Sequence, residues 1–345
     1  MFQSQNIDIL KKDFQDNKAI ALFLGAGCDL TWHYPEGPRY DHLRDVGKHR
    51  LNWDNLLKEL TENACVSNDE YNSINSLSSN TLKAAILKHR LGDSYIPIIQ
   101  NWLYSHCNRS VLLDSYPLYK DYQTTPTEEN LKKVPFGTLF VLAELILRQD
   151  SIKAVITQNY NNFLSEAIKI LLEEDKNNSY GVRQKCKPID VYDGWKDNPF
   201  DNDTFLIYHV HGYIPSPSEK MLKKENNHIV LSDEEFYHMS KEVFSWQNVI
   251  QINYLTHYSC IMLGLSLDDL TSLRLLRHAN IDKNSERIYW LRGGDSYKGD
   301  KENTTLRMLS EYYESQHICV VNDKDGYSHL YHELLTEVRN KKAKQ

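Results

Sequence analysis

The chain has 345 residues, and its 40 Lys and Arg against 47 Asp and Glu give a formal net charge of −7. Hydrophobic residues make up 41% and charged residues 25%, which excludes a disordered, collagen-like or coiled-coil chain. The longest apolar runs, Ala19–Ala26 and Phe140–Leu147, are shorter than the ~20 residues of a membrane span, and the N-terminus does not resemble a signal peptide. The negative charge gives no general attraction to nucleic acid. We therefore expect a cytoplasmic protein that contacts no membrane and binds no nucleic acid directly.

Six cysteines are scattered along the chain without any CxxC pair: Cys28, Cys65, Cys107, Cys186, Cys260 and Cys319. Structural zinc sites usually take two ligands from one tight turn, and small secreted scaffolds crowd their cysteines. The scatter predicts reduced thiols that mostly fill core space, and no metal site.

Six short apolar segments predict strands. The first, Lys18–Leu24, stops at the glycine turn Gly25–Gly27, and the second, Ile152–Thr157, stops at Gln158 before a helical pattern. The others are Phe205–Val210, Cys260–Leu263, Arg287–Leu291 and His317–Val321. Because these segments are apolar throughout and alternate with helices, they predict a mostly parallel sheet in a three-layer α/β fold.

The stretch between the first two strands is much longer than a normal crossover. It predicts the helices Trp53–Leu60, Thr81–Arg90, Tyr95–Ser105 and Phe136–Arg148. A large helical insertion after the first strand, at about residues 30–150, is the simplest account, within a single domain of residues 1–345. Its many tyrosines are expected either in the core or on a self-assembly surface.

Three polar loops and a helical tail are also predicted. Polar loops are predicted over Glu173–Asp203, Pro215–Asn227 and Gly293–Thr304. A helical tail is expected at about residues 325–345, ending in the basic stretch Arg339–Lys344, which is interpreted as solvated or as a docking point for a partner.

Parallel sheets bind ligands at the carboxyl ends of their strands, and polar or glycine residues follow four predicted strands here. The turn Gly25–Gly27 would let a phosphate approach backbone amides, although a tight turn without a ligand explains it equally well. The full dinucleotide fingerprint is absent, because Leu30 stands at the third glycine position, and so is a Walker-type GxxxxGK[ST].

Three other strand ends carry side chains suited to chemistry. The run Thr157–Asn162 (TQNYNN) can orient ribose hydroxyls, a carboxamide or a water, or can cap the next helix. His211 can act as a general base or make a structural hydrogen bond, while His209 is expected to face the opposite wall or the core. Gly264–Asp268 opens another helix, so Ser266 and Asp268 could bind a ligand or cap that helix.

Six segments, in this order, resemble the sirtuin-like domain family, specifically the divergent bacterial branch that hydrolyses NAD in antiviral defence. They are Leu24–Cys28 (LGAGC), Asn52–Lys58 (NWDNLLK), Thr157–Ser165 (TQNYNNFLS), His209–Tyr213 (HVHGY), His228–Met239 (HIVLSDEEFYHM) and Gly264–Arg277 (GLSLDDLTSLRLLR). Each segment alone is loose, and their ordered occurrence from about residue 20 to about residue 290 carries the resemblance.

The resemblance implies a Rossmann-like sheet that uses NAD as its substrate without a metal. Asn159 would hold the nicotinamide ribose, and His211 would act on a ribose hydroxyl or on the attacking water. The remaining cofactor-binding residues would be Gly25, Ala26, Gly27 and Cys28 at the pyrophosphate, Gln158 and Asn161 beside Asn159, and Gly264, Ser266 and Asp268 near the adenosine ribose.

Two departures from the sirtuin pattern bear on activity. Asn161 stands where the pattern has an aspartate, so a negative charge that would stabilise the developing ribose cation is missing. The paired CxxC turns of protein-deacylating sirtuins are also missing, which removes one wall of an acyl-lysine groove.

The sequence therefore predicts an NAD+ hydrolase that releases ADP-ribose and nicotinamide and acts in antiviral defence by depleting NAD. A catalytically weak module that binds NAD or ADP-ribose, and an NAD-dependent protein deacylase, are the alternatives. By resemblance, we expect activation by homo-oligomerisation or by a partner such as a translocase-type ATPase or an Argonaute-like protein.

Overall fold

The computed structural model describes residues 2–16, 18–29, 52–175, 186–194, 203–219, 229–242, 244–265, 270–279, 287–293, 308, 311–315, 318–323 and 327–343. Among these residues, none of the helices combines the length and the apolar character that crossing a membrane requires.

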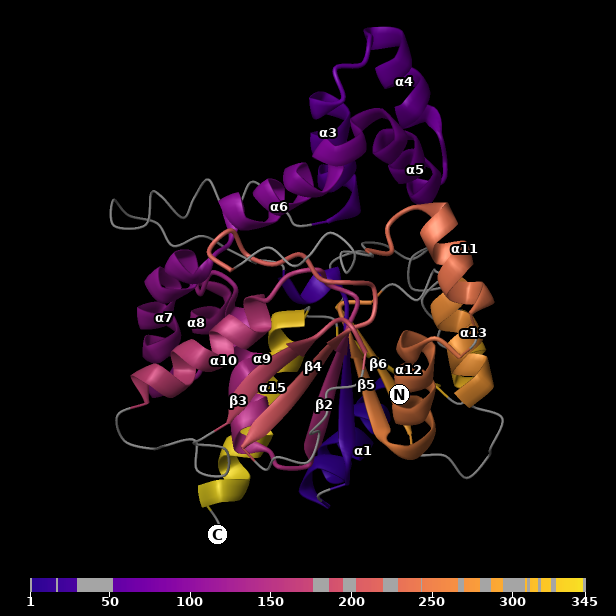
Figure 1. Cartoon of the computed structure of the whole chain (residues 1–345). Coiled ribbons are helices and arrows are strands. Elements are labelled where there is room, and N and C mark those ends of the chain that lie inside the picture. Colours follow the sequence, from indigo (N-terminus) through magenta and orange to yellow (C-terminus); the bar gives the residue numbers. More distant parts are fainter. Residues whose placement is uncertain are drawn as a thin grey trace.

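A single sheet of seven parallel strands forms the centre of the molecule (Figure 1). The strands are β1 (Ile20–Leu24), β2 (Ile152–Thr157), β3 (Lys187–Val191), β4 (Thr204–His209), β5 (Ser259–Leu263), β6 (Ile288–Gly293) and β7 (Ile318–Asp323). Their order in the sheet is β3-β4-β2-β1-β5-β6-β7. This confirms the predicted Rossmann-like α/β fold and all six predicted strands.

The seventh strand, β3, corrects the prediction of a polar loop over Glu173–Asp203. Its sequence, KPIDV, mixes polar residues and a proline with two apolar ones, so it lacks the apolar run that marks the central strands. Among the residues that the structure describes, it is an edge strand that pairs with β4 alone, and most of its residues are partly exposed. A proline is tolerated at such an edge, where one side of the strand needs no partner.

Helices cover both faces of the sheet and extend beyond its end. They are α1 (Phe2–Gln15), α3 (Trp53–Asn63), α4 (Asn68–Ser76), α5 (Asn80–Leu91), α6 (Tyr95–His106), α7 (Arg109–Thr124), α8 (Glu128–Lys132), α9 (Gly137–Arg148), α10 (Phe163–Glu174), α11 (Asp233–Lys241), α12 (Trp246–His257), α13 (Leu270–Ala279) and α15 (Tyr327–Ala343), with the short 3₁₀ helices η1 (Ala26–Asp29) and η3 (Gly92–Ser94).

The central strand β1 shows why the fold has three layers. Its five residues are all buried, and they alternate between two hydrophobic cores. Leu22 and Leu24 face the core that contains α9, α10 and α15, whereas Ala21 and Phe23 face the core that contains α12 and α13. Apolar residues on both faces of a strand are what a sheet covered by helices on both sides requires.

Residues 52–151, the part of the insertion between β1 and β2 that the structure describes, are mainly helical, as predicted, and divide into two parts. Helix α9 lies against the sheet and α10, and its residues Gly137–Leu147 are all buried. Helices α3 to α6 instead lie beyond the carboxyl ends of the strands (Figure 1). The tyrosines of α6 and α7 belong to the core, with Tyr95, Tyr119 and Tyr122 almost fully buried.

The strand order fixes where a ligand is expected. From β1 the chain runs to β2 and β4 on one side of the sheet, and it returns to β5 on the other side of β1. Loops after β1 and its neighbours therefore diverge and leave a crevice at their carboxyl ends.

Candidate functional site

A cavity of about 510 Å³ lies at the carboxyl ends of β1, β2 and β4. The sheet side contributes Ala26, Gln158, Asn159, Asn161 and His211. The opposite side comes from the helices beyond the sheet, including Trp53 of α3 and Trp102 of α6, and from Phe236 of α11. Five of the predicted site residues, far apart in sequence, thus line one cavity.

Asn159 follows β2 and is held from three directions. Its main-chain N–H donates to Thr157 Oγ1 at 3.0 Å, and its Nδ2 donates to the carbonyl oxygen of Gly25 at 3.2 Å. Its main-chain carbonyl oxygen lies 2.9 Å from Nδ1 of His209. The side chain is therefore fixed against the turn that follows β1, at the wall of the cavity.

His211 lies two residues after β4 and is 6% exposed. Its ring meets the ring of Phe236 edge to face, with centroids 5.4 Å apart, and its carbonyl oxygen accepts the N–H of Val230 at 2.7 Å. Gly212 follows with φ of 96°, a conformation that favours glycine, so the chain turns immediately after the imidazole. These contacts hold the ring at the edge of the cavity.

The glycines after β1 and β5 bring two loops together. A Cβ on Gly25 would lie 2.5 Å from the carbonyl oxygen of Gly264, and a Cβ on Gly27 would lie 2.7 Å from its Cα. The N–H of Gly27 donates to the Gly264 carbonyl at 3.1 Å, and that of Gly25 donates to Leu263 at 2.9 Å. These two amides are engaged in the loop contact, while Ala26 between them lines the cavity.

Cys28 lies beneath this loop contact rather than at the cavity. It is fully buried, its Sγ donates to the carbonyl oxygen of Leu263 at 3.3 Å, and Tyr331 Oη is 3.6 Å away. Four of the six cysteines are buried, in agreement with the prediction that they mostly fill core space.

Gln158 and Asn161 combine cavity lining with structural bonds. Gln158 Nε2 donates to Ser272 Oγ on α13 at 3.0 Å. Asn161 Oδ1 accepts the N–H of Phe163, the first residue of α10, at 3.2 Å. Asn161 thus fulfils the helix-start role considered for this run, and it still lines the cavity.

Gly264 is described, with φ of 64°, but it does not line the cavity. Ser266 and Asp268 lie outside the described residues. Of the three residues predicted to lie near the adenosine ribose, the structure therefore describes Gly264, which contacts the turn after β1.

Sequence reasoning missed the wall supplied by the helical insertion, which includes Ser79 and Thr81 at the start of α5 and Trp102 of α6. Trp53 lies in Asn52–Lys58, one of the six segments that resemble the sirtuin-like family, so the sequence could have indicated its place in the site. No local pattern could point to the others, because their place depends on how α3, α5 and α6 pack over the sheet.

One ion pair links the insertion to the other rim of the cavity. Lys88 of α5 bonds to Glu235 of α11, which also accepts the N–H groups of Leu231 and Ser232. Burial alone would raise the pKa of Glu235, but Lys88 and these amides outweigh it and lower the pKa below its ordinary value.

Polar side chains converge on a crevice above a parallel, three-layer sheet, which is where proteins of this Rossmann-like α/β class bind their ligands. The family model of the SIR2-like domain matches residues 153–321, from β2 into β7, a range that contains Asn159, His211 and Gly264. Residues 153–321 therefore form a sirtuin-like domain, which supports a function related to NAD. A search of curated proteins finds no match.

Proposed function

We propose that this protein is an NAD+ hydrolase that cleaves NAD+ to ADP-ribose and nicotinamide. The observation that carries the proposal is the single cavity that brings Asn159 and His211 together inside a SIR2-like domain. An amide beside a buried imidazole suits a reaction in which a ribose is oriented and a proton is moved.

The chemistry requires little covalent help from the protein. The bond between ribose C1′ and the nicotinamide nitrogen breaks, nicotinamide leaves with the electron pair as a neutral base, and positive charge develops on the ribose. Water then forms the new C1′–O bond and loses one proton. In the proposed mechanism, Asn159 orients the ribose and His211 accepts the proton from water or from a ribose hydroxyl.

The chemical character of the cavity lining supports a dinucleotide as the substrate. Trp53, Trp102 and Phe236 provide apolar and aromatic surface opposite the polar strand ends. Such a combination suits a ligand that has both flat rings and hydroxyl groups. A dinucleotide has both.

A second candidate function is a module that binds NAD or ADP-ribose without turnover. The observation that favours it is Asn161, which carries no charge and whose Oδ1 accepts the Phe163 N–H. A site without an anion beside the ribose is expected to stabilise the developing cation less well.

One experiment separates the two candidates. The purified protein is incubated with NAD+, and free nicotinamide and ADP-ribose are quantified by chromatography for the wild type, Asn159→Ala and His211→Ala. Hydrolysis predicts turnover that both substitutions reduce by about 100-fold or more. Binding of NAD+ by calorimetry with no product under any condition would instead establish the binding module.

The same assay tests protein deacylation as a third possibility. Nicotinamide release that requires an acetylated peptide, with loss of the acetyl group from the peptide, would identify a deacylase. We expect the rate to be independent of such a peptide, because water is the nucleophile in the proposed reaction.

We further propose that the activity serves antiviral defence by NAD depletion and is switched on by self-assembly or by a partner. The support is the motif resemblance together with the cost of an unrestrained NAD+ hydrolase to its own cell. A translocase-type ATPase or an Argonaute-like protein is the kind of partner proposed. Measuring elution mass and NAD+ turnover with and without the candidate partner tests this: equal turnover in all assembly states would contradict it.

A further inference from the structure

A buried polar network lies beneath the polar run that follows β2. Its centre is Asp190 of the edge strand β3, whose Oδ1 lies 2.8 Å from Nε2 of His209 on β4. The other oxygen, Oδ2, accepts the hydroxyl of Ser165 on α10 at 2.7 Å. The side chain of His209 is 1% exposed and that of Asp190 is 14% exposed, so both are largely shielded from water.

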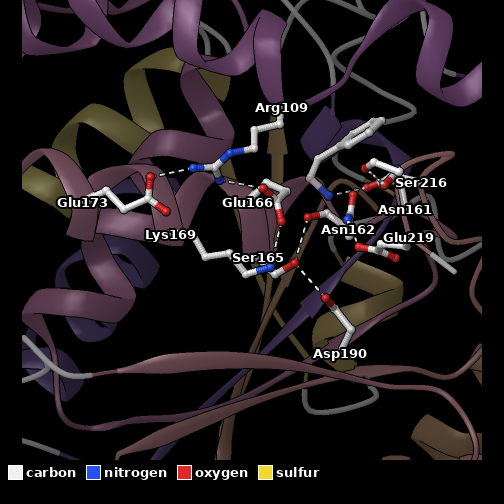
Figure 2. A network of polar contacts seen from close by, with 12 residues as sticks. Arg109, Asn161, Asn162, Ser165, Glu166, Lys169, Glu173, Asp190, Ser216 and Glu219 are labelled. Carbon is white, nitrogen blue, oxygen red and sulfur yellow. Dashed lines mark hydrogen bonds and ion pairs between the residues drawn. The ribbon is translucent and has the colours of Figure 1, made fainter.

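This network reaches the main chain of the polar run Thr157–Asn162 at two points. Nδ1 of His209 faces the carbonyl oxygen of Asn159 at 2.9 Å, and Oγ of Ser165 faces the carbonyl oxygen of Asn162 at 2.9 Å. Figure 2 shows Ser165 between Asn162 and Asp190. A carbonyl oxygen only accepts, so Nδ1 of His209 is the donor in the contact with Asn159, while Nε2 lies within hydrogen-bond distance of Asp190 Oδ1.

A second set of hydrogen bonds fixes the side chain of Asn162. Asn162 Nδ2 donates to Glu219 Oε1 at 2.7 Å (Figure 2). Tyr213 Oη donates to Glu219 Oε2 at 2.7 Å. The ring of Tyr213 in turn meets the ring of His209 edge to face, with centroids 4.8 Å apart. These contacts form a closed ring of residues, which runs through His209, Asp190, Ser165, Asn162, Glu219 and Tyr213 and returns to His209.

We propose that His209 and Asp190 are positioning residues for the reaction: they fix the carbonyl of Asn159 and thereby aim its side chain into the cavity. The inference rests on the proposed NAD+ hydrolysis. Neither residue lines the cavity, so neither touches substrate directly. Displacing a reacting group by about 1 Å costs on the order of 100-fold in rate, so a loss of this support falls on kcat.

Two substitutions of His209 separate its two contacts. His209→Asn places an amide N–H near the position of Nδ1, so it keeps the donor to Asn159 and loses the contact with Asp190. His209→Gln places its amide near Nε2, so it keeps the contact with Asp190 and loses the donor to Asn159. The two variants have similar polarity and differ in which bond survives.

Asp190 offers a matching pair. In Asp190→Asn the amide Nδ2 donates to His209 Nε2 and the amide oxygen accepts from Ser165, so every contact of the network survives without a charge. In Asp190→Ala both contacts are lost. Rescue of activity by the asparagine variant would show that geometry, rather than charge, is what Asp190 supplies.

We expect His209→Gln to lower kcat for NAD+ by about 10–100-fold with KM changed by less than about twofold, because the donor to Asn159 is lost. Asp190→Ala should also lower kcat, because it loses the contact with Ser165 as well as that with His209, whereas His209→Asn leaves the bond between Asp190 and Ser165 intact. His209→Asn and Asp190→Asn should stay within about fivefold of the wild-type kcat. Val338→Ala on α15, which packs against α9, controls for a general loss of stability. Equal losses in all four variants, scaling with melting temperature, would overturn the inference, and so would no loss in any of them.

Hydrogen exchange keeps this test separate from that of the proposed function. The amides of Asn159 and Phe163 should exchange at least about tenfold faster in His209→Gln than in His209→Asn. A wild type without turnover would contradict NAD+ hydrolysis while leaving this difference measurable. Equal exchange in both variants would contradict the positioning role even if the wild type hydrolyses NAD+.

Discussion

Asn161 joins two functions in one side chain. Its Oδ1 accepts the N–H of Phe163 and so fixes the start of α10, while the residue lines the cavity beside Asn159. An aspartate carboxylate would accept the same N–H, because Asn and Asp serve equally well at helix starts. It would also add the negative charge that the sirtuin pattern places here. A change at this position therefore alters the electrostatics of the site without altering its scaffold.

We predict that Asn161→Asp raises kcat for NAD+ hydrolysis by about tenfold, which corresponds to about 1.4 kcal/mol of transition-state stabilisation. The reason is that an anion next to the ribose favours the developing cation. Turnover is measured as nicotinamide released per enzyme. Asn63→Asp, on the exposed surface of α3, adds the same charge away from the cavity and should leave turnover unchanged. A rate at or below that of the wild type would show that the site gains nothing from an anion.

The site residues that could be predicted share one property: a pattern in their immediate sequence neighbourhood indicates their place in the site. Asn159 and His211 directly follow buried apolar runs, and parallel strands bring such ends to one edge of the sheet. Trp102 and Ser79 line the same cavity without any such signal. Their contribution follows from long-range packing of the insertion, which no short pattern encodes.

At the level of elements, the site depends on the contact between the loops after β1 and β5. Gly25 and Gly264 meet backbone to backbone, with no room for a side chain on either. The same turn accepts Nδ2 of Asn159 at the Gly25 carbonyl. The loop contact thus links the sheet's central pair of strands to the proposed catalytic amide.

We predict that Gly25→Ala lowers both stability and turnover. Its new Cβ would meet the backbone oxygen of Gly264 at 2.5 Å, so the loops must move apart at a cost of about 2–3 kcal/mol in unfolding free energy. Turnover should fall by about tenfold or more because Asn159 shifts with the turn. Denaturant unfolding and nicotinamide release measure the two effects.

Gly92→Ala is the matched control for that prediction. Gly92 has φ of 52°, yet a Cβ there would meet nothing within 4 Å. Its substitution strains the backbone between α5 and η3 and is expected to lower stability while leaving turnover near that of the wild type. Wild-type turnover in Gly25→Ala would mean that the loop contact does not position the site.

Two elements show where sequence patterns reach their limit. Strand β3 was missed because an edge strand buries little, and its polar residues resemble a loop, although Asp190 in it anchors the network beneath Asn159. The sequence predicts that Arg339–Lys344 is either solvated or a docking point for a partner, and the first alternative is wrong for Arg339. It lies on α15 and bonds to Glu144 of α9 through Nε at 2.9 Å and Nη2 at 2.8 Å. The structure of β3 depends on its pairing with β4, and the burial of Arg339 depends on Glu144. Neither partner is close in sequence, so the local pattern of polar and charged residues does not reveal it.

For the whole molecule, the pair of Glu144 and Arg339 fastens the last helix to the main core. The side chain of Glu144 is fully buried, and Arg148, Tyr119 and Gln123 also bond to its carboxylate. Burial by itself would raise the pKa of Glu144, but the bonds and charge of Arg339 and the charge of Arg148 lower it to about 2. The carboxylate is thus held in its charged form by its partners.

This pKa has a consequence for stability with a definite sign. The pKa of Glu144 is lower in the folded chain than its ordinary value of 4.5, so the stabilisation is complete above about pH 4.5 and is lost as the pH falls towards about 2. The shift corresponds to roughly 3 kcal/mol of unfolding free energy. Removing the charge at neutral pH also leaves Arg339 buried without its partner, which is strongly destabilising.

We predict that Glu144→Gln is less stable than the wild type by about 3–5 kcal/mol at pH 7, and that this difference narrows as the pH is lowered from 4.5 to 2. The glutamine cannot lose or gain a proton in this range, whereas the wild-type carboxylate becomes neutral. Denaturant unfolding at a series of pH values gives the two curves. Glu62→Gln, at an exposed ion pair with Lys58 on α3, should show a difference close to zero throughout. A difference in unfolding free energy between wild type and Glu144→Gln that stays constant with pH would contradict a charged Glu144 with a lowered pKa.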